Sequence, residues 1–284
     1  MHEKMKKTTS CAKAHMFTIS LSLLFLFLAL SLLNGEAQTS PLEPGRTFPQ
    51  REKTHRIMSY NIHHGQGMDD QVDIKRIGRL INRVNPEVVG LQEVDSVVNR
   101  SGNIDILQQL SEQTGMHATF GYSILHDGGK YGNGLLTREK PIDVKKIALP
   151  GANEARTAQI VELEKYVVVN THLSLNGEER LQSVKIITEA VKGYDKPVFL
   201  IGDLNARPDS APIQFLSQQW QILSNPDHNT APSTNPKATI DYILGYTDNG
   251  QTYAKLNARV IDEKVASDHL PLFVDVQLKT PASE

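Results

Sequence analysis

Between residues 56 and 276 the chain alternates short β-rich apolar runs with helical stretches, which limits it to folds containing both sheets and helices. One run, Val167-Val168-Val169, is continuously apolar, as is typical of a strand buried on both faces. The gaps between runs are short, and no second linker interrupts them. The predicted strands cover residues 56–62, 88–92, 117–123, 134–137, 142–148, 155–163, 166–172, 198–202, 240–244, 255–260 and 272–276.

Helices are predicted where apolar residues recur at helical spacing, as at Ile74, Ile77 and Ile81. Strands that follow one another directly between residues 142 and 172 favour antiparallel neighbours in part of the sheet. The pattern predicts one α/β domain over residues 54–284, a four-layer sandwich of two packed, mainly antiparallel β-sheets flanked by α-helices. The predicted helices cover residues 73–84, 104–114, 178–191 and 211–217.

The N-terminus has the features of a secretory signal peptide. A basic stretch precedes an apolar run at residues 17–33, and the small-x-small sequence GEA follows at 35–37. We therefore predict a signal peptide over residues 1–37, a polar linker over residues 38–53, and export to the periplasm or outside the cell. An uncleaved N-terminal membrane anchor is the alternative.

The charge balance does not favour a nucleic-acid partner. Without residues 1–37 the chain keeps 26 basic and 30 acidic residues, a net charge of −4, and loses Cys11, its only cysteine. Sequence-independent nucleic-acid binding depends on neutralising phosphates with Lys and Arg, so a broad basic face is not indicated. Nor does the sequence indicate a stable partner protein, and membrane contact is expected only through the substrate or an uncleaved signal.

Short polar clusters directly follow the predicted strands, where α/β proteins commonly build their sites. Taken singly, each is as well explained by a turn or a solvated strand end. Together, in this order, they resemble the motifs of the endonuclease/exonuclease/phosphatase superfamily, which includes deoxyribonucleases, abasic-site endonucleases, sphingomyelinases and inositol polyphosphate phosphatases. The matching segments are SYN (59–61), LQEV (91–94), YGNGLLTR (131–138), NTHL (170–173), GDLN (202–205), IDYI (240–243) and SDHLP (267–271).

The resemblance implies a divalent cation, because hydrolysis of a phosphodiester requires neutralisation of the phosphate and leaving oxygens. It makes Glu93 the principal metal ligand, with Asn61 and Asp268 completing or orienting the coordination sphere. Carboxylate and amide oxygens suit Mg²⁺, and Mn²⁺ as an alternative.

The same resemblance assigns the acid–base groups. His269 would contact the scissile phosphate or take a proton from the attacking water, and Asp241 would orient its imidazole. Asp203 and Asn205 would position the water and a phosphate oxygen, respectively. The sequence leaves open whether Asp203 or His269 is the base. His172 would protonate the leaving oxygen or bind phosphate, as in the deoxyribonuclease and sphingomyelinase branches.

Four further residues are predicted to contact the substrate: Arg156, Asn170, Asn133 and His63. A surface position is the alternative for Arg156. His63 stands where abasic-site endonucleases carry an Asp near the metal, so metal binding and ordinary packing both remain open for it.

These observations predict an exported, metal-dependent hydrolase of phosphodiesters, with a small or lipid-linked substrate ahead of DNA or RNA. The alternative within the fold is a secreted nuclease, and the alternative of another class is a non-catalytic protein that binds phosphate ligands. Substrate selection is expected from loops at residues 95–103, 126–133 and 225–237.

Overall fold

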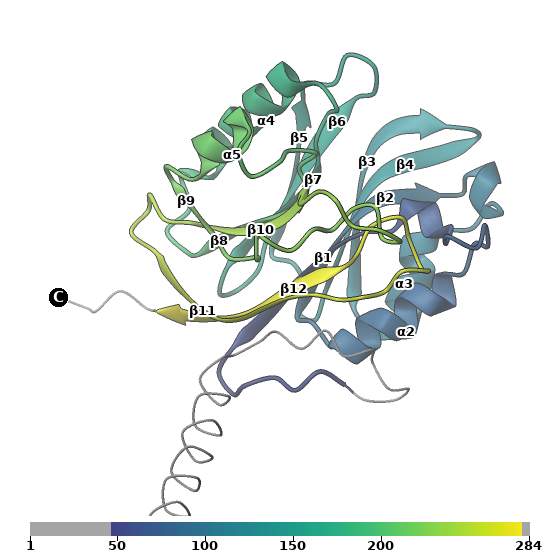
Figure 1. The fold of residues 1–284 in the computed structure, drawn as a ribbon, viewed down its shortest axis with the longest axis horizontal. Helices are drawn as coiled ribbons and strands as arrows, with labels where there is room; N and C mark the ends of the chain where they lie inside the picture. Colours follow the sequence, from purple (N-terminus) through teal and green to yellow (C-terminus); the bar gives the residue numbers. More distant parts are fainter. Residues whose placement is uncertain (1–46, 280–284) are drawn as a thin grey trace, which may run out of the picture. The chain divides into compact units, whose positions relative to one another are not determined.

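Twelve strands form in residues 47–279, the part of the chain that this computed structural model describes (Figure 1). The first sheet has the strand order β11-β12-β1-β2-β4-β3 and the second the order β5-β6-β7-β8-β10-β9. The first sheet consists of β1 (His55–Asn61), β2 (Val88–Ser96), β3 (His117–His126), β4 (Gly129–Thr137), β11 (Thr252–Val260) and β12 (Leu272–Lys279). The second consists of β5 (Asp143–Leu149), β6 (Arg156–Glu162), β7 (Val167–His172), β8 (Val198–Asp203), β9 (Trp220–Ile222) and β10 (Asp241–Tyr246).

Most neighbouring strands are antiparallel, as predicted, but each sheet contains one parallel pair: β1 with β2, and β7 with β8. The short strand β9 was not predicted. The segment at residues 126–133, predicted to be a loop, is instead largely a tight hairpin between β3 and β4.

Helices cover the outer face of each sheet, so the predicted four-layer sandwich is confirmed (Figure 1). Asp73 caps α2 by accepting a hydrogen bond from the backbone N–H of Arg76, and Asn176 caps α4 in the same way from Glu178. The helices are α2 (Ile74–Val84), α3 (Ile106–Thr114), α4 (Gly177–Val191) and α5 (Ala211–Leu216), and the 3₁₀ turns are η1 (His63–Gly65) and η2 (Asn99–Ser101).

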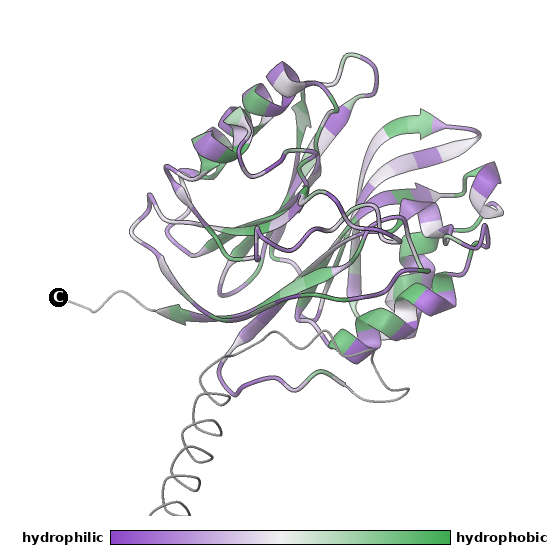
Figure 2. Ribbon diagram, viewed as in Figure 1, coloured by the Kyte–Doolittle hydropathy of each residue, from purple (hydrophilic) through white to green (hydrophobic). Residues whose placement is uncertain are grey.

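Apolar side chains fill three layers of core. The strands and helices that contribute them carry many hydrophobic residues (Figure 2). One cluster lies between the two sheets, one between α2, α3 and the first sheet, and one between α4, α5 and the second sheet. The run at 167–169 contributes to two of these clusters, because Val168 packs between the sheets while Val167 and Val169 pack beneath the helices. A continuously apolar strand is therefore buried on both faces, as predicted.

The segment before β1 is attached to the domain by a buried arginine. Arg56 pairs through Nε and Nη2 with the two carboxylate oxygens of Asp275, at 2.6 and 2.9 Å. Its guanidinium also donates to the carbonyls of Phe48 and Pro49, and the Phe48 ring packs edge-on against Phe273. The end of the predicted linker thus contacts the domain, whereas residues 38–46 and the predicted signal peptide lie outside the described residues. Among residues 47–279, no helix combines the length and apolarity needed to cross a membrane.

Candidate active site

Strand register in the second sheet brings three titratable side chains to one edge. Parallel pairing of β7 with β8 places His172 opposite Asp203, and antiparallel pairing of β10 with β8 places Asp241 opposite the same Asp203. Gly202 precedes this aspartate with φ +146°, and a Cβ there would lie 1.9 Å from the carbonyl oxygen of Thr171. Only glycine permits this close approach of β7 to β8.

A β-bulge in the first sheet presents Glu93. The pairing of β2 with β4 shifts register between Leu91 and Val94, and Glu93 takes a left-handed φ of 57°. Bulges re-aim side chains near functional sites, and non-glycine residues in this conformation are strained. The bulge turns the Glu93 carboxylate towards Asn61, whose Nδ2 donates to Glu93 Oε1 at 2.9 Å and to Asp203 Oδ2 at 3.1 Å. Asn61 therefore connects the polar edges of both sheets.

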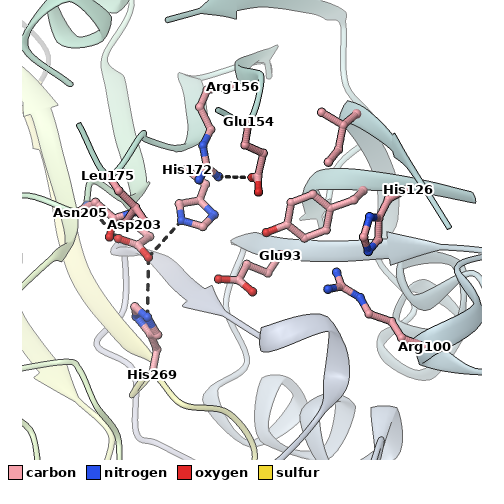
Figure 3. Close-up of a pocket in the computed structure, with 12 residues that line it drawn as sticks. Glu93, Arg100, His126, Glu154, Arg156, His172, Leu175, Asp203, Asn205 and His269 are labelled. Carbon is pink, nitrogen blue, oxygen red and sulfur yellow. Dashed lines mark hydrogen bonds and ion pairs between the residues drawn. The ribbon is translucent and has the colours of Figure 1, made fainter. Parts of the chain in front are cut away.

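The loop before β12 adds His269. Ser267 anchors this loop by donating its hydroxyl to the carbonyl of Asn61 at 2.8 Å. His269 Nδ1 lies 2.9 Å from Asp241 Oδ2. Its Nε2 lies 3.7 Å from Asp203 Oδ2 (Figure 3). Nε2 of His172 lies 3.5 Å from the same oxygen of Asp203. Two imidazoles therefore face one carboxylate.

Burial and neighbouring charge set different protonation states for these groups. Burial lowers the pKa of His172 to about 4, so this ring is neutral at pH 7. Burial also acts to lower the pKa of His269, but the charge and hydrogen bond of Asp241, followed by the charges of Asp203 and Asp268, raise it to about 10. The pKa of Asp203 is raised, first by burial and then by the negative charge of Asp241.

These groups open into a pocket of about 420 Å³ (Figure 3), within the size range of small-molecule sites. Arg156 lines it and pairs with Glu154 at 2.8 Å, so its predicted alternative as a surface residue is wrong. Arg100 enters from the opposite side and pairs with the fully buried Asp95 at 2.9 Å. The lining residues are Glu93, Arg100, Ile124, His126, Tyr131, Glu154, Arg156, His172, Leu175, Asp203, Asn205 and His269.

Two residues predicted to contact substrate connect the sheets instead. Asn170 is fully buried; its Nδ2 donates to the carbonyls of Leu91 and Gly134, and its Oδ1 accepts from Gln92. Asn133 is also buried and donates to the carbonyl of Thr157 in the other sheet. The structure therefore gives these two amides a role in holding the polar ends of the sheets together. Their motifs mark the site, but their side chains point into the inter-sheet layer.

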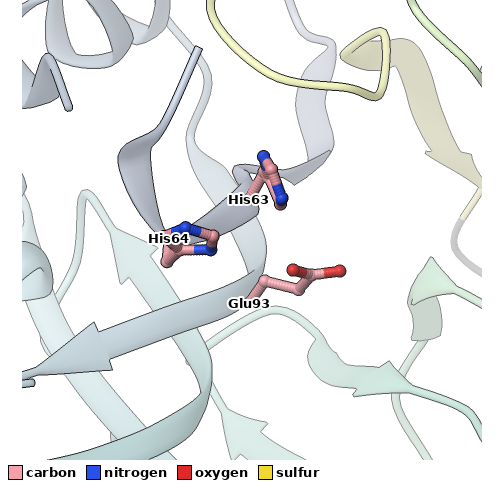
Figure 4. Close-up of side chains that lie close together, drawn as sticks. All are labelled: His63, His64 and Glu93. Carbon is pink, nitrogen blue, oxygen red and sulfur yellow. The ribbon is translucent and has the colours of Figure 1, made fainter. Parts of the chain in front are cut away.

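Asn205, Asp268 and His63, the other predicted site residues, lie in turns and loops that follow or precede strands. Asn205 lines the pocket in a left-handed conformation, with its backbone N–H donating to Asp203 Oδ1 at 2.9 Å. Asp268 is half-buried, and its Oδ1 lies 3.3 Å from Ser267 Oγ, whose one proton goes to the closer carbonyl of Asn61. His63 follows β1 in the turn η1, close to Glu93 (Figure 4).

Ligand-type atoms gather in two groups among the described residues. Those of His63, His64 and Glu93 lie within 4.8 Å of one another, and so do those of Asp203, Asp241 and His269. In the second group, His269 Nδ1 and Asp241 Oδ2 are engaged with each other, and Asp203 accepts hydrogen bonds from Asn61 and from the backbone of Asn205. The first group, with Asn61 beside it, offers a half-buried carboxylate and uncommitted donor atoms. These residues fit a divalent cation at Glu93.

Sequence reasoning missed Glu154, Ile124 and Leu175, which belong to no recognised motif and reach the pocket only through tertiary packing. Of the three predicted substrate loops, the first two contribute pocket residues: Arg100, His126 and Tyr131.

Comparison with known proteins identifies the family and the fold. A model of the Endonuclease/Exonuclease/phosphatase family matches residues 58–269. Protein angel of Drosophila melanogaster is 24% identical over 201 residues, and the match covers 58% of this chain and 56% of that protein. An endonuclease/exonuclease/phosphatase structure from Beutenbergia cavernae is 22% identical, with a TM-score of 0.69 over 81% of this chain and 73% of that one. A mannosyl-6-phosphatase structure from Bacteroides thetaiotaomicron is 15% identical, with a TM-score of 0.62 over 78% and 99%.

Proposed function

The chain belongs to the endonuclease/exonuclease/phosphatase family, and on this premise we propose that it is a divalent-metal-dependent hydrolase of a compact phosphodiester. The observation that carries the proposal is the meeting of Glu93, Asp203 and His269 at one pocket from separate strands and loops of both sheets. A binding protein would have no need to hold a half-buried carboxylate on a strained backbone beside a histidine–aspartate pair.

Glu93 and Asn61 would give the cation oxygen ligands, which both Mg²⁺ and Mn²⁺ accept, and the cation would supply charge neutralisation for the phosphate. Asp268, half-buried in the loop that Ser267 anchors to Asn61, would act on this centre by its negative charge.

The protonation states divide the acid–base work. A pKa of about 10 keeps His269 as an imidazolium at neutral pH, which suits contact with a phosphate oxygen and not proton abstraction. The raised pKa of Asp203 makes it a stronger base than a solvated carboxylate, so we assign it the proton of the attacking water. Neutral His172 would donate a hydrogen bond to phosphate rather than a proton to the leaving group. Asn205 and Arg156 would contact the remaining phosphate oxygens.

The pocket favours a compact substrate over a nucleic-acid strand. Its volume of about 420 Å³ matches a small ligand, and its two arginines are tied to Glu154 and Asp95 rather than spread along a groove. A nuclease tracking a strand would instead need a long basic channel with aromatic platforms.

A second candidate is hydrolysis of a phosphomonoester, such as a sugar phosphate. A monoester carries more negative charge than a diester, and Arg100 and Arg156 both line the pocket. The fold is shared with a mannosyl-6-phosphatase.

Turnover of simple aryl phosphates separates these candidates. We expect the purified protein to hydrolyse bis(p-nitrophenyl) phosphate faster than p-nitrophenyl phosphate, with activity dependent on an added divalent cation. The reverse order would select the monoesterase. No metal-dependent turnover of either ester, nor of DNA, RNA, phospholipids, sphingomyelin or inositol phosphates, would refute the hydrolase and leave a binding protein.

A further inference from the structure

The turn that follows β1 holds two adjacent histidines in a strained conformation. His63 and His64 have φ values of 44° and 45°, in a region that costs a non-glycine residue about 1–3 kcal/mol. Backbone hydrogen bonds fix the turn: Gly65 N–H donates to Ile62, Gln66 N–H to His63, and Asp73 N–H to Gly65. Strain maintained in this way at a polar edge points to a requirement for the position of these two rings.

Gln66 determines which nitrogen of each ring carries its proton. Its side-chain Nε2 donates to Asp70 Oδ1 at 3.2 Å, which turns its Oε1 towards His64 Nε2, also at 3.2 Å. An amide oxygen only accepts, so His64 carries its proton on Nε2 and has a lone pair on Nδ1. The backbone carbonyl of Gln66 lies 3.3 Å from His63 Nδ1, which likewise leaves the lone pair of His63 on Nε2.

The lone pair of His64 has no use within the protein as it stands. His64 is 7% exposed, and among residues 47–279 no group hydrogen-bonds its buried Nδ1. An unsatisfied buried polar atom costs about 1–3 kcal/mol. Packing does not account for it: an apolar residue of similar size would fill this space without leaving a polar atom unsatisfied. The ring of His63 packs edge to face against that of His64, with the two ring centroids 4.4 Å apart, so both rings are close enough to contact one bound ion.

Both rings lie beside Glu93 (Figure 4). One ligand atom from each of the three residues lies within 4.8 Å of the others, and donors around a bound ion are about 3.3 Å apart. Side-chain movements of about 1 Å would close the set. A metal-binding histidine usually donates its other N–H to a carbonyl or carboxylate, which is the arrangement that Gln66 provides for both rings.

We propose that His63 and His64 join Glu93 as ligands of the divalent cation, so that the site is a two-histidine, one-carboxylate centre selective for transition metals over Mg²⁺. This inference rests on the proposed function only in taking Glu93 as the metal residue. Imidazole nitrogen binds Zn²⁺, Co²⁺ and Mn²⁺ far better than Mg²⁺, which prefers an all-oxygen shell. The resident ion is then a transition metal, and Gln66 is a positioning residue behind both histidines.

The test uses the full chain stripped of metal. Isothermal titration with Mg²⁺, Mn²⁺ and Zn²⁺ gives affinities, and pulsed electron paramagnetic resonance of the Mn²⁺-loaded protein detects bound nitrogen directly. We expect Zn²⁺ and Mn²⁺ to bind at least tenfold more tightly than Mg²⁺, with nitrogen coupling to Mn²⁺. His63→Gln and His64→Gln should each weaken Zn²⁺ and Mn²⁺ binding by about 10–100-fold. His117→Gln, at an exposed histidine at the start of β3, is the matched control and should change neither.

Because His64 is buried, thermal unfolding of each variant checks that it still folds, and the half-buried His63 provides an independent variant if His64→Gln does not. Glu93→Gln distinguishes failure of the two-histidine centre from failure of the proposed hydrolase function. If Glu93→Gln abolishes binding while both histidine variants bind like wild type without nitrogen coupling, the two-histidine centre is overturned and the hydrolase proposal stands. If no divalent ion binds in a Glu93-dependent manner, both proposals fail.

Discussion

Replacing Asp241 by Asn should change the protonation state of His269 more than any other single substitution in the pocket. The carboxylate lies 2.9 Å from His269 Nδ1 and is the main influence that raises the pKa of this imidazole to about 10. Burial alone acts in the opposite direction. Without Asp241 the pKa should therefore fall towards the ordinary 6.5, because only the charges of Asp203 and Asp268 then oppose burial; the full change would be about 3.5 units, or about 5 kcal/mol.

The raised pKa of His269 makes the stability of the fold depend on pH. A folded-state pKa above the unfolded value means that protonated His269 stabilises the fold fully below about pH 6.5 and progressively less up to about pH 10. The wild type should lose stability across this alkaline window, whereas Asp241→Asn should not. The variant should also lose activity by about 10²–10⁴-fold at pH 7, because the imidazolium is gone.

Nuclear magnetic resonance of the imidazole C–H signals, recorded in chelator from pH 5 to 10.5, measures the pKa directly. Asp262→Asn, an exposed aspartate in the preceding loop, is the control and should leave the titration unchanged. Kinetically, His269→Ala and Asp241→Asn should each act as severely as the double variant, since paired groups are non-additive. A His269 that still titrates near pH 10 in Asp241→Asn would refute this account of its charge.

Four further predictions concern the metal, the substrate, the core and the N-terminus. Glu93→Gln should weaken divalent-cation binding in titration calorimetry without lowering the melting temperature, and chelator should abolish activity that an added cation restores; full activity in chelator would exclude the mechanism. A plot of log kcat/KM against log salt concentration should have a shallow slope, equivalent to about one or two neutralised phosphate charges, whereas a steep slope would indicate a nuclease. Asp275→Asn should cost about 3–5 kcal/mol in denaturant unfolding, because it leaves buried Arg56 without its ion pair, and a loss below 1 kcal/mol would contradict this. Mass spectrometry of protein from its native host should find a mature N-terminus near Gln38, not Met1.

Most of the site could be predicted from the sequence because its residues are adjacent to strands. Asn61, His172 and Asp203 each lie within one residue of the end of a predicted strand, and strand ends at one edge of a sheet must meet. The elements that were missed or misplaced depend on local geometry that periodicity does not encode. The hairpin of β3 and β4 has polar, glycine-containing residues that are equally typical of a loop, and the three-residue β9 is too short to show alternation.

The sequence by itself determined the layers of the fold and which residue types gather at its polar edge, because apolar periodicity specifies which face of each element is buried. Only the tertiary structure decided the direction of each side chain. A bulge turns Glu93 towards Asn61 in the site. Asn170 stands in an equally specific motif, NTHL, but its side chain faces the other sheet. The tertiary structure also decided protonation. His172 and His269 both stand before a leucine in their motifs, yet burial lowers the pKa of His172 and Asp241 raises that of His269. The reason is physical, since charge and desolvation act through distances that exist only once the two sheets have packed.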